Sequence, residues 1–310
     1  MTSPTPPTTP SEPSIPSTAP STTPSTVTPP TSRRVPVDAP PLRVVSFYPD
    51  VMNVYADRGN LIAVRHRAAE YGIALHEFDV SLGDPLPPEA DLVLIGGAQD
   101  REQHRVAHEL ADRGDTLRDW AEHDTAMLTV CGGFQLFGRW YRDKNGIVLP
   151  GAALFDVTTV SPGGAPRGRS GGRSPHAARA VGDILIESTL PHVGPRAERD
   201  SELVEIVGFE NHAGRTYLGP TARPFGHVRY GRGNNGDDGF EGAIYRQAIG
   251  TYLHGSVLPK NPRLLDHLLA AAFAHRLGEP ITLPELPAPY ADRAHDAAVQ
   301  IARTRAPARH

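Results

Sequence analysis

The chain contains one cysteine, Cys131, among 310 residues. A single thiol excludes an internal disulfide and a zinc site built from several thiolates, so Cys131 is either a buried core residue or a reactive thiol. Long apolar runs are also absent: none approaches the ~18 residues of a membrane span. The first 40 residues lack the continuous apolar stretch of a secretory signal. We therefore expect a cytoplasmic protein with no membrane span.

A basic surplus and an ATP-binding motif are missing as well. The net charge is −4, so no overall positive field attracts nucleic acid, and Arg167, Arg169 and Arg173 in a Gly/Ser-rich stretch favour a solvated loop. No G-x-x-x-x-G-K-[ST] phosphate loop occurs. Residues 231–236 match G-x-G-x-x-G but lead into residues 237–239 without a helix, which indicates a loop. We expect no cofactor in this chain.

Composition divides the chain into three parts. Residues 1–40 hold 12 of the 32 prolines and 17 serines or threonines, which predicts a disordered tail. Residues 41–280 have a globular composition, and the Gly/Arg-rich segment 161–178 within them predicts a flexible insertion. Residues 281–310, rich in proline, alanine and arginine, are predicted to form a C-terminal tail with one possible helix.

Apolar segments alternate with helical patterns in the first half of the globular region, which predicts an α/β domain with a parallel sheet covered by helices. Beyond Gly138 the segments are shorter and favour additional antiparallel strands. The predicted strands are Leu42–Phe47, Ala74–Phe78, Asp91–Ile95, Ala126–Val130, Asp183–Glu187, Leu203–Phe209, Phe225–Arg229, Gly242–Tyr245 and Ile249–His254, and the predicted helices are Asn60–Tyr71, Asp100–His123 and Arg263–Leu277.

Cys131 lies between the apolar segment Ala126–Val130 and the glycines Gly132 and Gly133, which open an apolar helix. Such a strand-turn-helix elbow presents a nucleophile at the carboxyl end of a parallel sheet, and the N-terminus of the next helix favours thiolate over thiol. The glycines let a substrate approach closely. A buried, inert cysteine is the alternative, and the two glycines make it the weaker interpretation.

His254 is the candidate base among fourteen histidines. A thiolate nucleophile usually works with a histidine, and His254 ends a predicted strand just before Gly255, so its ring would project from the sheet edge that presents Cys131. The two residues are 123 positions apart, and only the fold can bring them together. The alternative is a histidine that packs at a strand end.

Two glycine turns provide backbone N–H groups for an oxyanion hole. The N–H of Gly132 follows the candidate nucleophile, and the turn Gly96–Asp100 follows another buried strand at the same predicted edge. This second turn predicts a donor at Gly97 or Ala98. A plain strand-to-helix turn is equally compatible with the local sequence.

Four segments together resemble the cobyric-acid-synthase-type class I glutamine amidotransferases, and more narrowly the glutaminase subunits of lipid II isoglutaminyl synthases. These segments are Gly96–Asp100, Val130–Gln135, Val207–His212 and Tyr252–Pro262, and the resemblance extends from about Leu42 to Leu277. It implies a flavodoxin-like, mostly parallel sheet with helices on both faces.

The resemblance also implies an enzyme that hydrolyses L-glutamine to glutamate and ammonia, with Cys131 as nucleophile and His254 as base. It implies that Arg179 contacts the substrate glutamine, because a guanidinium binds a carboxylate through two hydrogen bonds. Many class I amidotransferases carry a glutamate two residues after the histidine, where this chain has Ser256. A Cys–His dyad is therefore expected, with the residue that orients the ring unidentified.

The partner implied by the resemblance is a Mur-ligase-like synthetase subunit that forms a heterodimer with this chain and holds ATP and Mg²⁺. The pair would amidate the D-glutamate of lipid II to D-isoglutamine in peptidoglycan synthesis, reaching the lipid-linked acceptor through the partner. One alternative is amidation of a corrin precursor, which the missing phosphate loop disfavours. Another is a non-catalytic docking subunit, which the presence of Cys131 and His254 disfavours.

Overall fold

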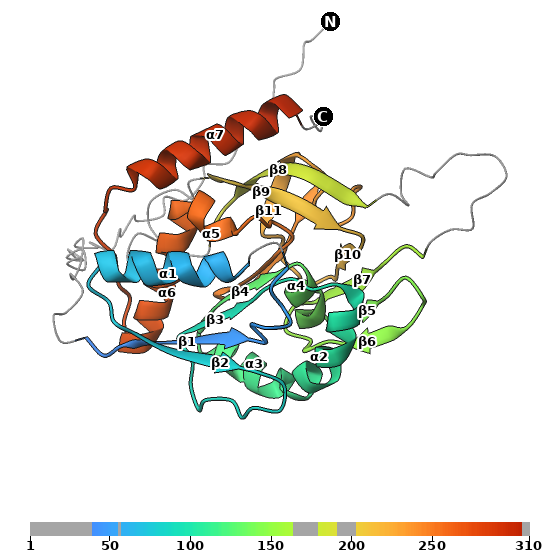
Figure 1. Cartoon of the computed structure of the whole chain (residues 1–310), viewed down its shortest axis with the longest axis horizontal. Helices are drawn as coiled ribbons and strands as arrows, with labels where there is room; N and C mark the ends of the chain where they lie inside the picture. Colours follow the sequence, from blue (N-terminus) through green and yellow to red (C-terminus); the bar gives the residue numbers. More distant parts are fainter. Residues whose placement is uncertain (1–38, 55–56, 164–178, 191–202, 306–310) are drawn as a thin grey trace, which may run out of the picture. The chain divides into compact units, whose positions relative to one another are not determined.

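The structure, a computed structural model, describes residues 39–54, 57–163, 179–190 and 203–305 (Figure 1). Most of the predicted tail at residues 1–40 and residues 164–178 of the predicted insertion lie outside the described residues. The described part forms a six-stranded central sheet with helices and two further four-stranded sheets. None of the described helices is long and apolar enough to cross a membrane.

The central sheet has five parallel strands and one antiparallel edge strand, which confirms the predicted α/β class. Its middle strands are buried along their whole length, as expected where both faces of a parallel sheet are covered. The order is β13-β14-β4-β3-β1-β2, formed by β13 (Ala243–Tyr245), β14 (Ala248–Thr251), β4 (Ala126–Val130), β3 (Leu92–Ile95), β1 (Leu42–Phe47) and β2 (Leu75–Val80).

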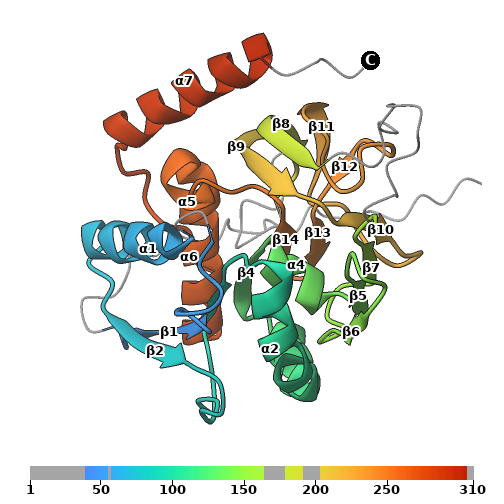
Figure 2. The ribbon, with the colours of Figure 1, turned by 45° about the vertical axis from the view of Figure 1, so that its right-hand side comes forward.

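Helices cover both faces of this sheet. Figure 2 shows α1 (Arg58–Glu70) and α6 (Pro262–Leu277) on one side of β4, and α2 (Asp100–Asp112) and α4 (Gly132–Phe137) on the other. The short α5 (Val257–Lys260) joins β14 to α6 on the side of α1. The arrangement places the carboxyl ends of the parallel strands at the start of α1, α2, α4 and α5.

The predicted helix Asp100–His123 is wrong as one element, because the structure has two helices there: α2 and α3 (Gly114–Glu122). Arg113 separates them and Gly114 begins α3, where a Cβ would come within 2.7 Å of the Ala152 carbonyl oxygen. Glycine also weakens a helix interior by roughly 1 kcal/mol relative to alanine. Periodicity alone did not reveal this break, because both helices keep their apolar face toward the same core.

The two other sheets are mainly antiparallel and come from the chain between α4 and β13. The sequence predicted β8 (Ala180–Ser188), β9 (Val204–His212) and β11 (Gly226–Tyr230) but missed strands of two to four residues, which are too short to show a period. The missed strands are β5 (Trp140–Arg142), β6 (Val148–Pro150), β7 (Val157–Val160), β10 (Arg215–Leu218) and β12 (Phe240–Glu241), in the orders β10-β7-β5-β6 and β12-β11-β8-β9.

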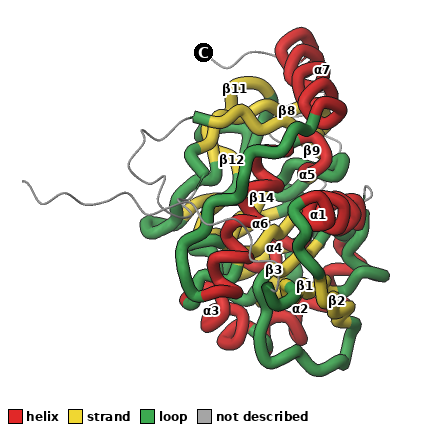
Figure 3. The backbone as a smooth tube through the Cα atoms, turned by 90° about the vertical axis from the view of Figure 1, so that its left-hand side faces the viewer, coloured by secondary structure: helices red, strands yellow, loops and turns green. Residues whose placement is uncertain are grey.

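The possible C-terminal helix is α7 (Pro289–Arg305), which lies beside β8 and β9 (Figure 3). Its Val299 and Ala302 are buried and pack with Leu185 of β8 and Val207 of β9 in a small apolar cluster of their own. Residues 289–305 therefore cover one face of an antiparallel sheet.

The last parallel strand, β14, ends at Thr251, three residues before the predicted end at His254. The N–H of Tyr252 donates to the side chain of Glu241 at 2.6 Å, so the chain leaves the sheet there. His254 instead forms an isolated antiparallel bridge with Phe209 of β9, through two backbone hydrogen bonds of 2.8 and 3.2 Å. This bridge fastens the residue after the central sheet to the β8–β9 sheet.

Candidate active site

Cys131 occupies the predicted elbow between β4 and α4, with φ 51° and ψ −105°. A non-glycine residue in such a conformation costs on the order of 1–3 kcal/mol and is kept only where its surroundings hold it. Its N–H donates to the Thr251 carbonyl at 2.8 Å, and its carbonyl accepts from the N–H of Gln135 at 2.9 Å. The parallel strand on one side and the first turn of α4 on the other therefore fix the elbow.

The glycines after Cys131 are required by the approach of a second turn. A Cβ on Gly132 would lie 2.8 Å from the Ala98 nitrogen, and a Cβ on Gly133 would lie 2.9 Å from the Gly96 carbonyl oxygen. The N–H of Gly133 donates to that same oxygen at 3.1 Å. The elbow and the turn after β3 are thus in direct contact, as the sequence predicted from their common sheet edge.

The structure brings His254 to Cys131. A Cβ on Gly97 would lie 2.9 Å from His254 Cε1 and 3.1 Å from Cys131 Cβ, so both side chains border the same glycine. His254 is fully buried, and it is held in place by its backbone bridge to Phe209. The two residues that sequence reasoning selected by chemical type therefore meet in space.

Asp57, which sequence reasoning did not select, is the third side chain at this point. It precedes α1, is 5% exposed, and places Oδ1 3.3 Å from His254 Nδ1. Its Oδ2 accepts the N–H of Gly97 at 2.7 Å. The only local signal for Asp57 is an acidic residue just before a helix, and 197 residues separate it from His254.

The environment of His254 favours the imidazolium form. Burial lowers its pKa, but the charge of the Cys131 sulfur and the hydrogen bonds with Asp57 and Cys131 outweigh burial and raise the pKa to about 10. These contacts with Asp57 and Cys131 therefore favour the charged form of His254 at neutral pH. A proton held at this position is available to a leaving group on a substrate bound to the sulfur.

Three backbone N–H groups were predicted as oxyanion donors, and the structure separates them. The N–H of Gly97 is taken by Asp57. Within residues 39–54, 57–163, 179–190 and 203–305, the N–H groups of Ala98 and Gly132 donate to no protein acceptor. Since a Cβ on Gly132 would lie 2.8 Å from the Ala98 nitrogen, these two amides border the same space beside Cys131.

A buried chain of amide side chains supports the turn that carries Ala98. Gln103 Nε2 donates to the Ala98 carbonyl at 3.1 Å and to Gln135 Oε1 at 3.0 Å, and Gln135 Nε2 donates to the Tyr252 hydroxyl at 3.1 Å. The Tyr252 ring stacks on His212 with 3.7 Å between ring centroids. The network joins α2, α4 and the residues after β14 behind the elbow.

Arg179 lies just before β8 and is exposed. Its guanidinium donates to the side-chain oxygen and, at 2.9 Å, to the backbone oxygen of Asn211. Within the described part of the chain, Arg179 makes no hydrogen bond or ion pair with Cys131 or His254. Its predicted contact with glutamine therefore stays a prediction. In the same described part of the chain, no cluster of three or more His, Cys, Asp or Glu side chains could hold a metal ion.

Comparison with known proteins agrees with this geometry. Residues 43–262 match the family of CobB/CobQ-like glutamine amidotransferase domains. The chain belongs to this family. The amidotransferase assignment and the α/β fold predicted from the sequence are thereby confirmed.

Two relatives of this amidotransferase are GatD subunits of lipid II isoglutaminyl synthase (glutamine-hydrolyzing). The Staphylococcus aureus N315 protein is 36% identical over 246 residues, which cover 79% of this chain and 89% of the relative. The Streptococcus pneumoniae R6 protein is 31% identical over 244 residues, which cover 78% of this chain and 85% of that protein. A probable cobyric acid synthase from Methanopyrus kandleri is 34% identical over 186 residues, but these cover 56% of this chain and only 32% of that larger protein.

The amidotransferase departs from the usual class I pattern at Ser256, and the structure shows what this residue does instead. Ser256 has φ 46° and stands at the start of α5. Its side chain packs against Gly59 of α1, where any Cβ would overlap the Ser256 hydroxyl. Position 256 therefore serves the packing between α1 and α5, and the carboxylate beside His254 belongs to Asp57, which precedes α1.

Proposed function

We propose that this chain is the glutaminase subunit of a lipid II isoglutaminyl synthase. It hydrolyses L-glutamine to glutamate and ammonia and delivers the ammonia to a Mur-ligase-like, ATP-dependent partner that converts the D-glutamate of lipid II to D-isoglutamine. The observation that carries this proposal is the meeting of Cys131 and His254 at the elbow. The 36% identity to a GatD subunit along 89% of its length supports the choice of acceptor.

The geometry supports a covalent mechanism with Cys131 as nucleophile and His254 as acid and base. The Cys131 sulfur attacks the side-chain amide carbon of glutamine, and the N–H groups of Ala98 and Gly132 stabilise the resulting oxyanion. His254 gives its proton to the nitrogen as the carbon–nitrogen bond breaks, which releases ammonia and leaves a thioester. The neutral His254 then takes a proton from water, whose oxygen attacks the thioester and releases glutamate and the sulfur.

Arg179 is the proposed contact for the carboxylate of the substrate glutamine. Its two hydrogen bonds with Asn211 hold the guanidinium at the start of β8, one residue before the pairing of Ala180 with His212. His212 in turn stacks on Tyr252, two residues from His254. A bidentate pair with a carboxylate would use guanidinium donors that Asn211 leaves open.

The partner completes the reaction, because no phosphate loop occurs in this chain. ATP and Mg²⁺ bind the synthetase subunit, which forms a heterodimer with this chain in the cytoplasm and contacts the lipid-linked acceptor. Amidation of a corrin precursor is the second candidate, supported by the Methanopyrus kandleri relative. The coverage of only 32% of that protein favours the cell-wall acceptor.

Replacement of the nucleophile tests the glutaminase activity. We expect Cys131→Ala to lower ammonia release from L-glutamine by at least ~10³-fold while the circular dichroism spectrum stays that of the wild type. Retained hydrolysis in this variant would contradict the mechanism.

Purification of the chain with its natural partners tests the acceptor. A Mur-ligase-like protein should accompany the chain, and recovery of a corrin-pathway enzyme would overturn the cell-wall assignment.

A further inference from the structure

The Asp57 carboxylate makes two contacts with the groups that surround Cys131. One oxygen lies 3.3 Å from His254 Nδ1, and the other accepts the N–H of Gly97 at 2.7 Å. Both contacts are buried, since Asp57 is 5% exposed and His254 has no exposed surface. A buried carboxylate that bonds to two elements at once restricts the position of both.

The contact with His254 selects the orientation of the imidazole ring. A carboxylate beside Nδ1 favours the proton on that nitrogen, which leaves Nε2 for the reacting groups at Cys131. The same contact stabilises the imidazolium, which gives its proton to the leaving nitrogen. This is the role that a glutamate two residues after the histidine would have played, and this chain has Ser256 there.

The contact with Gly97 orients the turn that carries the Ala98 N–H. Because Gly97 donates to Asp57, its peptide plane is fixed, and the next N–H is left for a substrate oxygen. The turn also lies close to the backbone before Asp57: a Cβ on Gly96 would come within 2.4 Å of the Met52 carbonyl oxygen and 2.8 Å of the Asp57 Cβ. Asp57 therefore sets the geometry of the base and of one oxyanion donor together.

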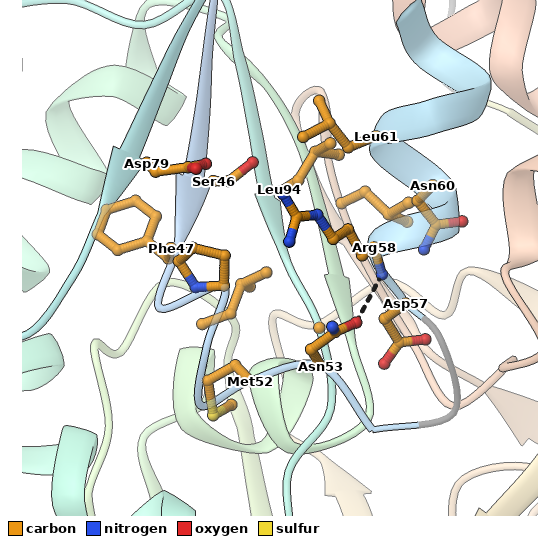
Figure 4. Close-up of a pocket in the computed structure, with 14 residues that line it drawn as sticks. Ser46, Phe47, Met52, Asn53, Asp57, Arg58, Asn60, Leu61, Asp79 and Leu94 are labelled. Carbon is orange, nitrogen blue, oxygen red and sulfur yellow. Dashed lines mark hydrogen bonds between the residues drawn. The ribbon is translucent and has the colours of Figure 1, made fainter.

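Neighbouring hydrogen bonds hold Asp57 in place. Asn60, 3% exposed, accepts the N–H of Leu258 at 3.0 Å, which fastens the start of α1 to the segment that follows His254. On the opposite side, Asn53 accepts the N–H of Arg58 at 2.8 Å (Figure 4). Hydrogen bonds thus hold Asn53 before Asp57 in the sequence and Arg58 and Asn60 after it, which supports a positioning role for the Asp57 carboxylate.

Other buried carboxylates in this region are engaged elsewhere. Glu210 accepts the N–H groups of Arg232 and Gly233 at 2.8 and 3.0 Å. Glu241 accepts the N–H of Tyr252 at 2.6 Å. These contacts hold the loop after β11 and the residue that follows β14.

We propose that Asp57 is the positioning residue of this amidotransferase, holding His254 and the Gly97–Ala98 turn in the arrangement that glutamine hydrolysis requires. The inference rests on the proposed function of Cys131 and His254. It assigns the acid of a Cys–His–Asp set to the start of α1 instead of to the segment after the histidine.

Asp57→Asn tests this assignment. Asp57 uses one carboxylate oxygen for the Gly97 N–H and the other for His254 Nδ1, whereas the side-chain amide of asparagine has only one acceptor oxygen. If the Asn oxygen keeps the Gly97 N–H, its NH₂ faces His254 Nδ1 and forces the proton onto the wrong ring nitrogen. We expect kcat for ammonia release to fall at least ~10²-fold with KM for glutamine changed less than ~3-fold. The alkaline limit of the kcat/KM profile should move to lower pH, because the imidazolium loses its carboxylate.

The matched control is Asp79→Asn. Asp79 is an exposed carboxylate that lines the same pocket as Asp57 but belongs to β2 (Figure 4). We expect wild-type kcat, KM and pH profile from this variant. All assays use the full chain together with the synthetase subunit recovered by co-purification.

The outcomes separate the inference from the proposed function. An inactive wild-type complex would remove the proposed function itself. An active wild type with an Asp57→Asn variant of equal kcat and unchanged pH profile, or one that changes KM alone, would overturn only the role of Asp57. Should Asp57→Asn not fold, nitrogen NMR of the wild-type His254 ring decides: a protonated Nδ1 at pH 8 supports the inference, and a neutral ring protonated on Nε2 alone overturns it.

Discussion

Gly97 shows how closely single residues are fitted around the proposed reaction centre. Its missing Cβ would lie 2.9 Å from His254 Cε1 and 3.1 Å from Cys131 Cβ. We expect Gly97→Ala to push the imidazole away from the sulfur and to lower the glutaminase kcat at least ~10-fold, with a loss of unfolding free energy of about 1–3 kcal/mol. Steady-state kinetics and urea denaturation measure the two effects.

Gly146→Ala is the control for that substitution. Gly146 has φ +84°, and a Cβ added there would meet no atom within 4 Å, so alanine costs backbone strain of about 1 kcal/mol without touching the site. This variant should lose stability and keep wild-type kcat. Equal losses of activity in both variants would mean that stability, and not the fit around Gly97, determines the effect.

The sequence pointed to some residues of the candidate site and not to others for a physical reason. Cys131 and His254 carry chemistry in their own side chains, and their glycine neighbours and strand ends are visible locally. Asp57 has no such signature, because its role depends on a contact across 197 residues. The choice between Gly97 and Ala98 as oxyanion donor also depended on the fold, since the N–H of Gly97 is occupied by Asp57.

At the scale of elements, long and strongly apolar segments were predictable and short ones were not. The bounds of β1 and β4 agree with the prediction to the residue, because a run of apolar residues between turn signals is a sufficient local pattern. The end of β14 was predicted three residues too late. Tyr252 donates to the Glu241 side chain and His254 pairs with Phe209, so neither continues the central sheet. Side-chain acceptors and bridges between sheets leave no periodic trace in a sequence.

Helix α7 provides the prediction for this scale. Val299 is 4% exposed in the cluster with Leu185 and Val207, whereas Ile301 on the same helix is 39% exposed. We expect Val299→Ala to cost about 1–3 kcal/mol of unfolding free energy and Ile301→Ala less than about 0.5 kcal/mol. Urea denaturation monitored by circular dichroism compares the two, and equal costs would show that α7 does not pack on β8 and β9 through this face.

At the scale of the whole molecule, the two ends of the parallel strands differ: the carboxyl ends carry the candidate site, and the amino ends are held by a buried carboxylate. The carboxyl ends carry Cys131 and the turn with Ala98, while the amino ends are fastened by Asp91, which precedes β3 and has no exposed surface. Its carboxylate accepts the backbone N–H of Arg43 at 2.7 Å and two guanidinium hydrogen bonds from the same residue. His275 of α6 adds a hydrogen bond of 2.8 Å, so one carboxylate joins β1, β3 and α6.

This network makes the stability of the whole domain depend on acid pH. Burial raises the pKa of Asp91, but the hydrogen bonds from His275 and Arg43 outweigh it and lower the pKa to about 2. The folded pKa lies below the unfolded value of ~3.9, so the contribution is complete above about pH 4 and is lost as the pH falls through about 2. We expect Asp91→Asn to cost about 2–3 kcal/mol of unfolding free energy at pH 7.

Chemical denaturation at a series of pH values measures this cost, which should shrink as the pH falls from 4 toward 2. Asp115→Asn is the control: Asp115 pairs with Arg118 at 3.2 Å, but its side chain is 95% exposed, so its loss should cost less than about 0.5 kcal/mol at every pH. A cost for Asp91→Asn that stays constant down to pH 2 would mean that packing around the side chain, and not its charge, holds β1, β3 and α6 together.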